Sequence, residues 1–438
     1  MGSCLGNRTV YEGVAMQLRP HRRVKALATI AILTAGATVL AGCSSSAPNA
    51  SEESAKPQAA TITFAASTLG DPGRGPGLQK LIDEYNSSQD VVTVKPASVP
   101  YPTFGQTVLT QMGGGAGPDL VRFDMPEFEA AASSGLLEQL DDKIDAKALN
   151  LIAGPDKYLT VDGHRYGVVF ENSNYGMFYN ADLIPSPPKT FDEFVQTAKD
   201  LTKGDTYGLA FRQTPAEEAG VWQDTFNYVL GFGGNWSNGK KLTIDSPQVI
   251  KGLEAYQQLY DANVIPKGAD AATFRKMFAN GKVGMELNNG GYATATTAAN
   301  PELNFSVAPI PFPVKKQGSL LAPIVVNSNS KHKDAALDFI KWLLKPSQQV
   351  KLQEVLGASS VATPTERSQA SLAKYPFLPV LDGLTNSGVP QIVLGFGAQT
   401  PDLRHVIVTQ ILSALQGQTD MKSAMQTAQK QAEEIVGR

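Results

Sequence analysis

The chain has 438 residues, of which 42% are hydrophobic and 18% charged, and its formal net charge is −3. This apolar content can fill more than one buried core, which excludes a disordered, collagen-like or coiled-coil chain. Two cysteines are too few for a disulfide scaffold or a cysteine-rich metal protein. The small negative charge provides no general basic surface, so we expect no nucleic-acid partner.

The N-terminal segment has the pattern of a lipoprotein export signal. A basic stretch, residues 19–25, precedes an uncharged apolar run, residues 26–42, which is short for a membrane-spanning helix and normal for a signal peptide. The run ends in the letters LAGC at Cys43, which resemble the bacterial lipobox, whose cysteine is lipidated and becomes the new N-terminus. We expect residues 1–42 to be removed. A weak transmembrane anchor is the alternative.

The next segment predicts a tether. Residues 44–60 contain no aromatic and no branched aliphatic side chain, so they cannot bury apolar surface. We therefore expect residues 43–60 to hold the protein flexibly at the outer face of the bacterial cytoplasmic membrane, without a spanning helix. Either Met1 or Met16 is the start, and Met16 gives a signal of more usual length.

The first part of the body alternates between strand and helix patterns. Strands are predicted at 61–65, 91–94 and 120–123, and apolar residues at helical spacing lie between them, at 78–85 and 104–112. This order argues for a parallel sheet with helices on its faces. Ligands of such sheets bind outside the carboxyl ends of the strands.

The alternation resumes after residue 170. Strands are predicted at 175–179, 207–211 and 283–287. Helices are predicted from Thr190, from Ser246 to about residue 262, from Ser330, over 408–415 and from Asp420. The expected fold class is α/β, with two lobes and a helical C-terminus.

The side chains of common enzyme classes are missing from the predicted body. It has no cysteine, and its histidines, His164, His332 and His405, are far apart and form no zinc motif. The glycine run at 113–117 lacks the Gly-Lys-Ser/Thr of a phosphate loop, and no G-x-S-x-G elbow occurs. We expect no cofactor and no metal. A glycosidase needs only two carboxylates, so a cell-surface glycoside hydrolase is the alternative function.

Aromatic and polar side chains gather in the glycine-rich connections. A sugar presents apolar C–H faces and many hydroxyls, so its site needs rings to stack on and polar groups to pair with the hydroxyls. The candidate rings are Tyr101, Trp222, Trp236 and Tyr292. The candidate polar residues are Asp71, Arg74, Asp124, Glu171, Asn172, Asn174, Arg212, Gln223 and Asn289.

Four stretches of the body carry a family resemblance. They are GPDLV at 117–121 with SGLL at 134–137, YGV at 166–168 followed by YNADL at 179–183 and PPKTFDEF at 187–194, FANGKVGM at 278–285, and HKDAA at 332–336 with WL at 342–343. Together they resemble bacterial extracellular solute-binding proteins of the carbohydrate class, the family that includes maltose-binding proteins and serves ABC importers. The resemblance covers residues 61–438.

The resemblance implies a periplasmic-binding-protein-like fold with two α/β lobes around a ligand cleft. The implied boundaries are 61–170 plus 311–370 for the N-terminal lobe and 171–310 plus 371–438 for the C-terminal lobe. The chain would cross between the lobes near 167–172 and 308–314, and a third time at 365–375. Hinge bending would close the lobes over a sugar, and a monomer without enzymatic activity would deliver that sugar to permease subunits.

The resemblance also assigns site residues. Glu171 falls where maltose-binding proteins have a sugar-contacting Glu, and Tyr292 falls on their stacking Trp. Trp222 or Gln223 lies near a second stacking aromatic residue, and Phe396 near a C-terminal one. The chain departs from the family pattern at three points. It has Tyr instead of Trp at 292, the loop after Glu171 is two residues longer, and no aromatic residue follows the first strand. A polyol or a glycerophosphodiester is therefore an alternative ligand, and sensing is an alternative role to import.

Overall fold

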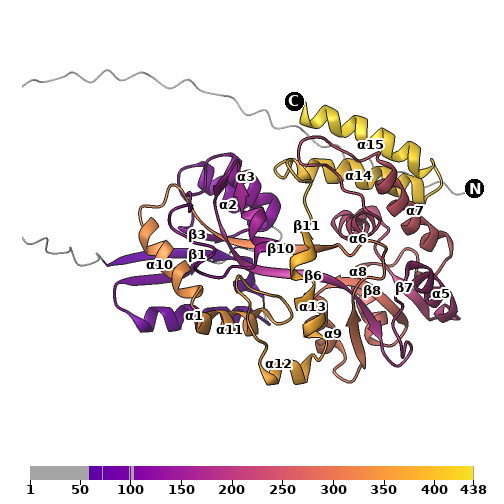
Figure 1. The fold of residues 1–438 in the computed structure, drawn as a ribbon, viewed down its shortest axis with the longest axis horizontal. Coiled ribbons are helices and arrows are strands. Elements are labelled where there is room, and N and C mark those ends of the chain that lie inside the picture. The colour runs from indigo at the N-terminus through magenta and orange to yellow at the C-terminus, as the bar shows by residue number, and fades with distance from the viewer. Residues whose placement is uncertain (1–58, 72, 98, 100–102, 438) are drawn as a thin grey trace, which may run out of the picture. The chain divides into compact units, whose positions relative to one another are not determined.

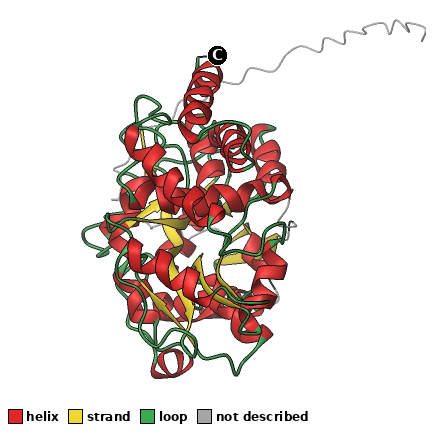
Figure 2. Ribbon diagram, turned by 90° about the vertical axis from the view of Figure 1, so that its right-hand side faces the viewer, coloured by secondary structure: helices red, strands yellow, loops and turns green. Residues whose placement is uncertain are grey.

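The computed structural model describes residues 59–71, 73–97, 99 and 103–437. Figure 1 shows these residues as a central sheet with helices around it, and Figure 2 shows the same layers from the side. The predicted signal peptide, the predicted lipidation site Cys43 and the candidate ring Tyr101 lie outside the described residues. In the part of the chain that is described, no helix has the length and apolar character needed to cross a bilayer.

The first βαβαβ unit forms as its sequence pattern predicts. Strand β1 (Ala60–Ala66) pairs in parallel with β2 (Val92–Ala97) and β3 (Leu120–Arg122). Helices α1 (Gly75–Ser88) and α2 (Phe104–Gly113) connect them. The four apolar residues spaced along α1, namely Leu78, Leu81, Ile82 and Tyr85, are all buried.

The sheet as a whole is mixed, because antiparallel strands extend the parallel unit of β1, β2 and β3. Its order is β2-β1-β3-β10-β6-β8-β7. Strand β10 (Gln317–Val326) is antiparallel to both β3 and β6 (Val168–Asn180), while β7 (Tyr207–Ala210) is parallel to β8 (Val283–Asn289). Strand β9 (Phe305–Ala308) pairs with β6, and β11 (Gly388–Pro390) with β10. A two-stranded ribbon, β4 (Thr160–Val161) with β5 (His164–Arg165), stands apart.

The remaining helices have the following bounds: α3 (Met125–Ser133), α4 (Ala153–Asp156), α5 (Phe191–Leu201), α6 (Glu218–Gly231), α7 (Pro247–Asp261), α8 (Ala271–Ala279), α9 (Gly291–Ala299), α10 (Lys333–Leu343), α11 (Pro346–Leu356), α12 (Gln369–Lys374), α13 (Leu378–Gly383), α14 (Thr400–Leu415) and α15 (Met421–Val436). Helices α5 and α15 begin directly after Thr190 and Asp420, as predicted, and both side chains cap their helix. Helix α10 begins at Lys333 instead of Ser330. The Ser330 hydroxyl instead donates to Asp119 Oδ1 over 2.6 Å and accepts from the His332 peptide, which stabilises the turn before the helix.

Buried apolar residues form two large cores and a small third cluster. The first core takes residues from Ile62 to Phe170 and from Leu321 to Ala362, and Ile392 joins it. The second takes residues from Tyr175 to Phe312 and from Val389 to Ala432. We call these parts the first and second lobe. The exact boundaries given above stay a prediction. The third cluster surrounds Phe178 and includes Tyr292.

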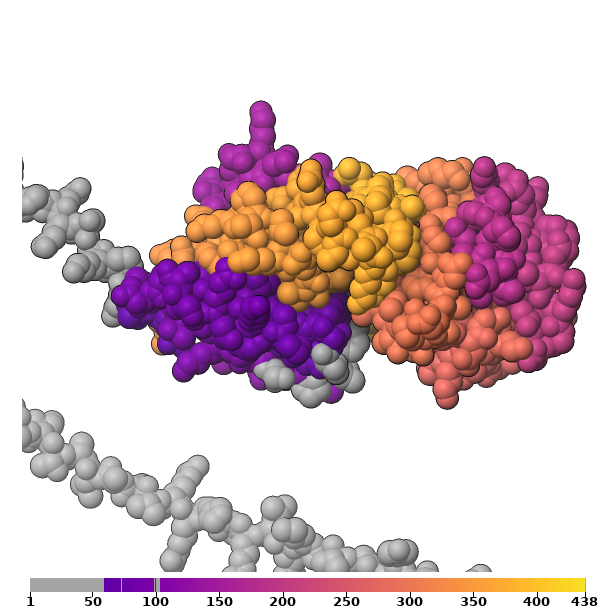
Figure 3. Space-filling model, turned by 90° about the horizontal axis from the view of Figure 1, so that it is seen from below, coloured from indigo at the N-terminus to yellow at the C-terminus, as the bar shows by residue number. Residues whose placement is uncertain are grey.

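Two neighbouring strands join the lobes. Strand β6 is buried in the first core up to Phe170 and in the second from Tyr175. On the second crossing, Phe312 is buried in the second core and Leu321 of β10 in the first, so the chain passes between the lobes between these two residues. In Figure 3 the segment that carries α10 to α13 runs from orange, along the indigo part of the first lobe, to yellow at the boundary with the second lobe.

Candidate functional site

Glu171 lies where β6 passes from one lobe to the other. Its side chain is 6% exposed, and three side chains hold both carboxylate oxygens. Arg74 Nη1 and Ser359 Oγ each donate to Oε1 over 2.9 Å, and Arg122 Nη2 donates to Oε2 over 3.1 Å. The carboxylate is therefore fixed in place by residues from three separate segments.

The ion pairs continue on both sides of Glu171. Arg74 Nε also pairs with Asp71 over 2.8 Å, and Arg122 also pairs with Asp124. Burial raises the pKa of Asp71, but hydrogen bonds from Arg74 and the Gly73 peptide lower it by more, so that this carboxyl is ionised at neutral pH. We call these five residues the ion-pair row: Asp71, Arg74, Glu171, Arg122 and Asp124. With three carboxylates against two guanidiniums, it is close to charge balance.

Asp124 ends the row at a cavity that both lobes line. It lies directly before α3, and its side chain is 44% exposed. The cavity has a volume of about 450 Å³ between α2, α3 and the segment that contains Ala398 and Pro401. Asp124 therefore faces a space into which groups from the second lobe also point.

A second, deeper network holds Arg212 and Tyr292. Arg212 pairs with Asp224 over 2.9 Å and with Glu286 over 3.3 Å, and the Tyr292 hydroxyl donates to Glu286 over 2.7 Å. Burial raises the pKa of Asp224 to about 7, although Arg212 acts in the opposite direction. Each of these side chains is almost fully buried. Arg212 and Tyr292 therefore stabilise the second lobe and are not exposed to a ligand in this conformation.

The candidate rings lie inside the second lobe. Trp222 stacks on Trp236 with ring centroids 5.2 Å apart, and Trp236 is fully buried. The Trp222 indole N–H donates to the carbonyl oxygen of Gln391 over 3.1 Å. Phe396 is half-buried against the second core. In this conformation Trp222, Trp236 and Tyr292 present no open face for stacking, whereas Phe396 stays partly exposed.

Neighbouring side chains on β6 point to opposite faces of the sheet. Asn172 contacts Ser360, and Asn174 donates to the carbonyl of Leu381 and to Thr385. Asn172 also pairs with Ser360 through its backbone, so these two amides fasten β6 to the chain between Ser360 and Thr385. Ser173, which shares the face of Glu171, donates to Asn289 over 3.5 Å.

Several buried polar atoms near the crossing lack a hydrogen-bond partner among the described residues. They include the Tyr175 hydroxyl, Gln391 Oε1 and Asn172 Oδ1. Asn289 and Gln391 both approach the Tyr175 hydroxyl, whose pKa burial raises to about 12. Gln391 Nε2 donates to the carbonyl oxygen of Gln223 over 3.2 Å. Unpaired buried groups are costly, so this cluster has capacity to bind a polar ligand or water.

The sequence prediction missed Arg122, Ser359 and Gln391, as well as Asp224 and Glu286. Arg122 carried a usable signal, because it is a charged residue between Val121 and Phe123 in a buried strand. A charge in such a place is normally paired, which predicts a nearby carboxylate. Ser359 and Gln391 stand in loops without a recognisable pattern.

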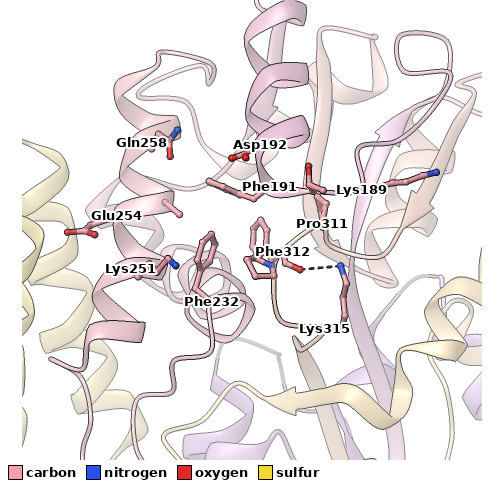
Figure 4. A pocket seen from close by; sticks show the side chains of 13 residues that line it. Lys189, Phe191, Asp192, Phe232, Lys251, Glu254, Gln258, Pro311, Phe312 and Lys315 are labelled. Carbon is pink, nitrogen blue, oxygen red and sulfur yellow. Dashed lines mark hydrogen bonds between the residues drawn. The ribbon is translucent and has the colours of Figure 1, made fainter.

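A separate cavity of about 680 Å³ opens on the second lobe between α5 and α7. Figure 4 shows Phe191, Phe232 and Phe312 at its centre, while Lys189 and Glu254 extend to opposite sides. Lys315 donates to the carbonyl oxygen of Phe312 over 3.1 Å. The polar groups do not converge there, so we do not treat it as the functional site. Among the described residues, no group of three or more His, Cys, Asp or Glu side chains is placed to hold a metal ion.

Comparison with known proteins gives both sequence relatives and structural neighbours. The chain is 26% identical over 250 residues to the maltotriose-binding protein of Pyrococcus abyssi, which covers 54% of this chain and 53% of that protein. It is 25% identical over 336 residues to an uncharacterized lipoprotein of Streptomyces antibioticus, with 72% of each chain covered. The chain thus spans about half the length of the first of these relatives.

Solved structures share the fold at low identity. The cyclic alpha-maltosyl-1,6-maltose binding protein of Arthrobacter globiformis superposes with a TM-score of 0.73 at 20% identity, covering 85% of this chain and 97% of that one. A solute-binding protein of Agrobacterium radiobacter K84 in complex with ribitol gives 0.70 at 22% identity, covering 86% and 99%. These neighbours confirm the expected fold class, a two-lobed α/β binding-protein fold.

A family model described as bacterial extracellular solute-binding protein matches residues 80–379. This match covers more than half of the chain, including the ion-pair row from Arg122 onward and the two crossing strands. The chain is therefore a member of the bacterial extracellular solute-binding proteins, the family predicted from its motifs.

Proposed function

We propose that this protein is the receptor of an ABC importer and captures an uncharged sugar, a di- or oligosaccharide, between its two lobes. The ion-pair row carries the proposal, because it runs from the strand crossing at Glu171 to the shared cavity at Asp124. A relative and a neighbour named for maltose-type ligands support the same class.

The chemistry of the row favours a neutral, hydroxyl-rich ligand. A carboxylate such as Asp124 accepts hydrogen bonds from sugar hydroxyls, and guanidiniums donate to them. Because the carboxylates and guanidiniums largely neutralise one another, the row has little excess charge to attract an ion. A glycerophosphodiester would need cations that are not already paired, whereas Arg74 and Arg122 are both engaged by carboxylates.

In the proposed mechanism the two lobes close over the ligand and catalyse no reaction. The ligand would contact both lobes at once and so stabilise the closed conformation over the open one. Bending would occur where β6 and β10 cross between the cores. The closed monomer would then present its ligand to the permease subunits, and no bond of the ligand would be broken.

The proposal includes the membrane anchor. Cys43 would carry lipid, and residues 44–60 would connect it to β1. The lipobox-like LAGC sequence and a relative described as a lipoprotein support this part. The receptor would then stay close to the permease at the outer face of the membrane.

A polyol is the second candidate ligand, because a neighbour with this fold holds ribitol. Titration calorimetry against maltose, maltotriose, galactose oligosaccharides and ribitol separates the two. We expect heat with an oligosaccharide. Heat with ribitol alone would replace the sugar by a polyol, and heat only with amino acids or phosphodiesters would refute the proposal. Reducing sugar released from an oligosaccharide by the pure protein would favour a glycoside hydrolase instead.

A matched pair of variants locates the site. Asp124→Asn removes the charge of the row at the cavity with little change in shape, and we expect it to weaken binding by at least about tenfold. Asp261→Asn changes an exposed aspartate at the end of α7, far from the cavity, and should leave binding unchanged. Equal affinities for both variants would remove Asp124 from the site.

A further inference from the structure

Helix α3 of the first lobe packs against the segment that enters α14 of the second lobe, and two glutamates lie at this contact. Glu127 and Glu129 are on α3. Its residue Phe128 is buried in the first core, whereas Leu403 on α14 is buried in the second. The contact therefore joins the lobes at the shared cavity, which Glu127 and Pro401 both line.

Two glycines allow the helices and loops to approach this closely. The Glu129 carboxylate lies against Gly397, whose peptide N–H donates to it. A Cβ at position 397 would overlap that carboxylate. On the other side of α3, a Cβ at Gly105 would lie 2.6 Å from Glu127 Oε1. Each carboxyl therefore lies directly against the backbone of a glycine.

Neither carboxyl has a cation of its own among the described residues. Glu127 Oε2 is buried without a hydrogen-bond partner. The charged groups that face Glu127 are Asp124, Arg122 and Arg404. Arg122 is paired with Asp124 and Glu171, and Arg404 is paired with Glu218, which also binds His405. Apart from the Gly397 peptide, no polar or charged group of the described residues offsets the burial of Glu129.

We propose that Glu127 and Glu129 form a proton-dependent latch, in which protonation of the two carboxyls holds α3 against the Gly397 segment and so closes the lobes. Separation of the lobes would expose to water Glu129 and the side of Glu127 that faces α14, where the charged form of a carboxyl is stable. Closure would therefore take up protons, independently of which ligand occupies the cleft.

The direction of the pH effect follows from linkage. Burial raises the pKa of both carboxyls from 4.5 to about 7, and the nearby charge of Asp124 contributes at Glu127. Below the ordinary carboxyl pKa both conformations are protonated and closure does not depend on pH. As the pH rises from there to about 7, the open form ionises first, so each carboxyl lowers the closed-to-open ratio by up to about tenfold per pH unit. Above about 7 the ratio becomes constant again.

The test measures the distance between the lobes without any sugar. Spin labels are attached to Thr110→Cys on α2 and Thr409→Cys on α14, two exposed positions, in the full chain with Cys4→Ser and Cys43→Ser. Distance distributions are recorded by double electron–electron resonance between about pH 5 and about pH 8. We expect the closed-to-open ratio to fall by at least about tenfold over this range.

Three variants separate the latch from a general effect of pH. The double variant Glu127→Gln with Glu129→Gln keeps the shape and removes the ionisation, and it should stay closed at about pH 8. Glu254→Gln, on the exposed face of α7, should keep the full pH response. Gly397→Ala should open the lobes at every pH, with circular dichroism to verify its fold. An unchanged distance in the parent protein, or a full pH response in the double glutamine variant, would overturn the proposal. Because no sugar is present, either result leaves the proposed ligand untouched.

Discussion

The guanidinium of Arg122 donates to Glu171 over 3.1 Å across an intervening strand. Arg122 ends β3 and Glu171 lies on β6, and β10 separates these two strands in the sheet. The contact therefore connects strands that do not pair with each other, at the position where β6 and β10 pass between the lobes. It holds the carboxylate in position before any ligand arrives, which lowers the entropy cost of binding.

Replacement of Glu171 by alanine tests this pair. Arg122 and Arg74 would keep Asp124 and Asp71 as partners, so we expect a loss of about 2–3 kcal/mol in the free energy of unfolding, below the loss for a fully isolated buried charge. Urea denaturation at neutral pH measures it. Glu302→Ala, at an exposed position, is the control and should change little. A loss for Glu171→Ala as small as that of the control would mean that the pair contributes nothing to stability.

Trp236 tests whether an aromatic residue of the glycine-rich loops belongs to the core or to the site. Its ring is fully buried and stacks on Trp222, so Trp236→Ala should lower the free energy of unfolding by about 3–5 kcal/mol. The folded fraction should bind ligand within about threefold of the parent protein. Trp236→Phe, which refills part of the space, should recover part of the stability. The opposite pattern, lost binding at full stability, would support the stacking role expected from the sequence.

We expect Tyr292 to stabilise the folded protein through its hydroxyl group. Tyr292→Phe keeps the ring and removes the hydrogen bond to Glu286, a buried carboxylate that also pairs with Arg212. We expect a loss of about 1–3 kcal/mol in thermal or urea unfolding. Calorimetry with the ligand should show an unchanged affinity, because the hydroxyl is not exposed to the cavity. A large fall in affinity without a change in stability would contradict this assignment.

The proposed anchor predicts a simple fractionation result. Cys43→Ser should move the protein from the membrane fraction to the soluble fraction of cells, since residues 44–60 contain no aromatic or branched aliphatic side chain to hold it at a membrane. Mass spectrometry of the parent protein should find lipid on residue 43. Cys4→Ser is the control, because residue 4 lies within the predicted signal peptide. Equal membrane association of both variants would argue for a spanning anchor.

Local patterns predicted the elements that bury one face. Helix α1 and strand β1 were predicted because their apolar residues repeat at helical or strand spacing. Strand β10 was missed. It is buried along nearly its whole length, so it has no alternation of polar and apolar residues, and it contains Gly318 and Pro323. Its antiparallel pairing makes the sheet mixed.

For the candidate site, the sequence supplied residue types but not neighbours. Glu171, Arg74, Asp71 and Asp124 were selected and do lie in one row. Arg122, which joins Glu171 to Asp124, was not. Trp222, Trp236 and Tyr292 are candidate stacking rings by sequence and are buried in the structure. Whether a ring covers a ligand or a core depends on which helices pack over it, and spacing along the chain does not contain that information.

The sequence by itself determined the export signal pattern, the absence of cysteine after residue 43, the family and most of the elements. These are properties of composition, motif and local periodicity, which act over a few residues. The tertiary structure alone decided which charges are paired, which rings are buried and where α3 meets the second lobe. Those outcomes depend on contacts between distant residues, such as Arg74 and Glu171 or Glu129 and Gly397, and chain topology decides which distant residues meet.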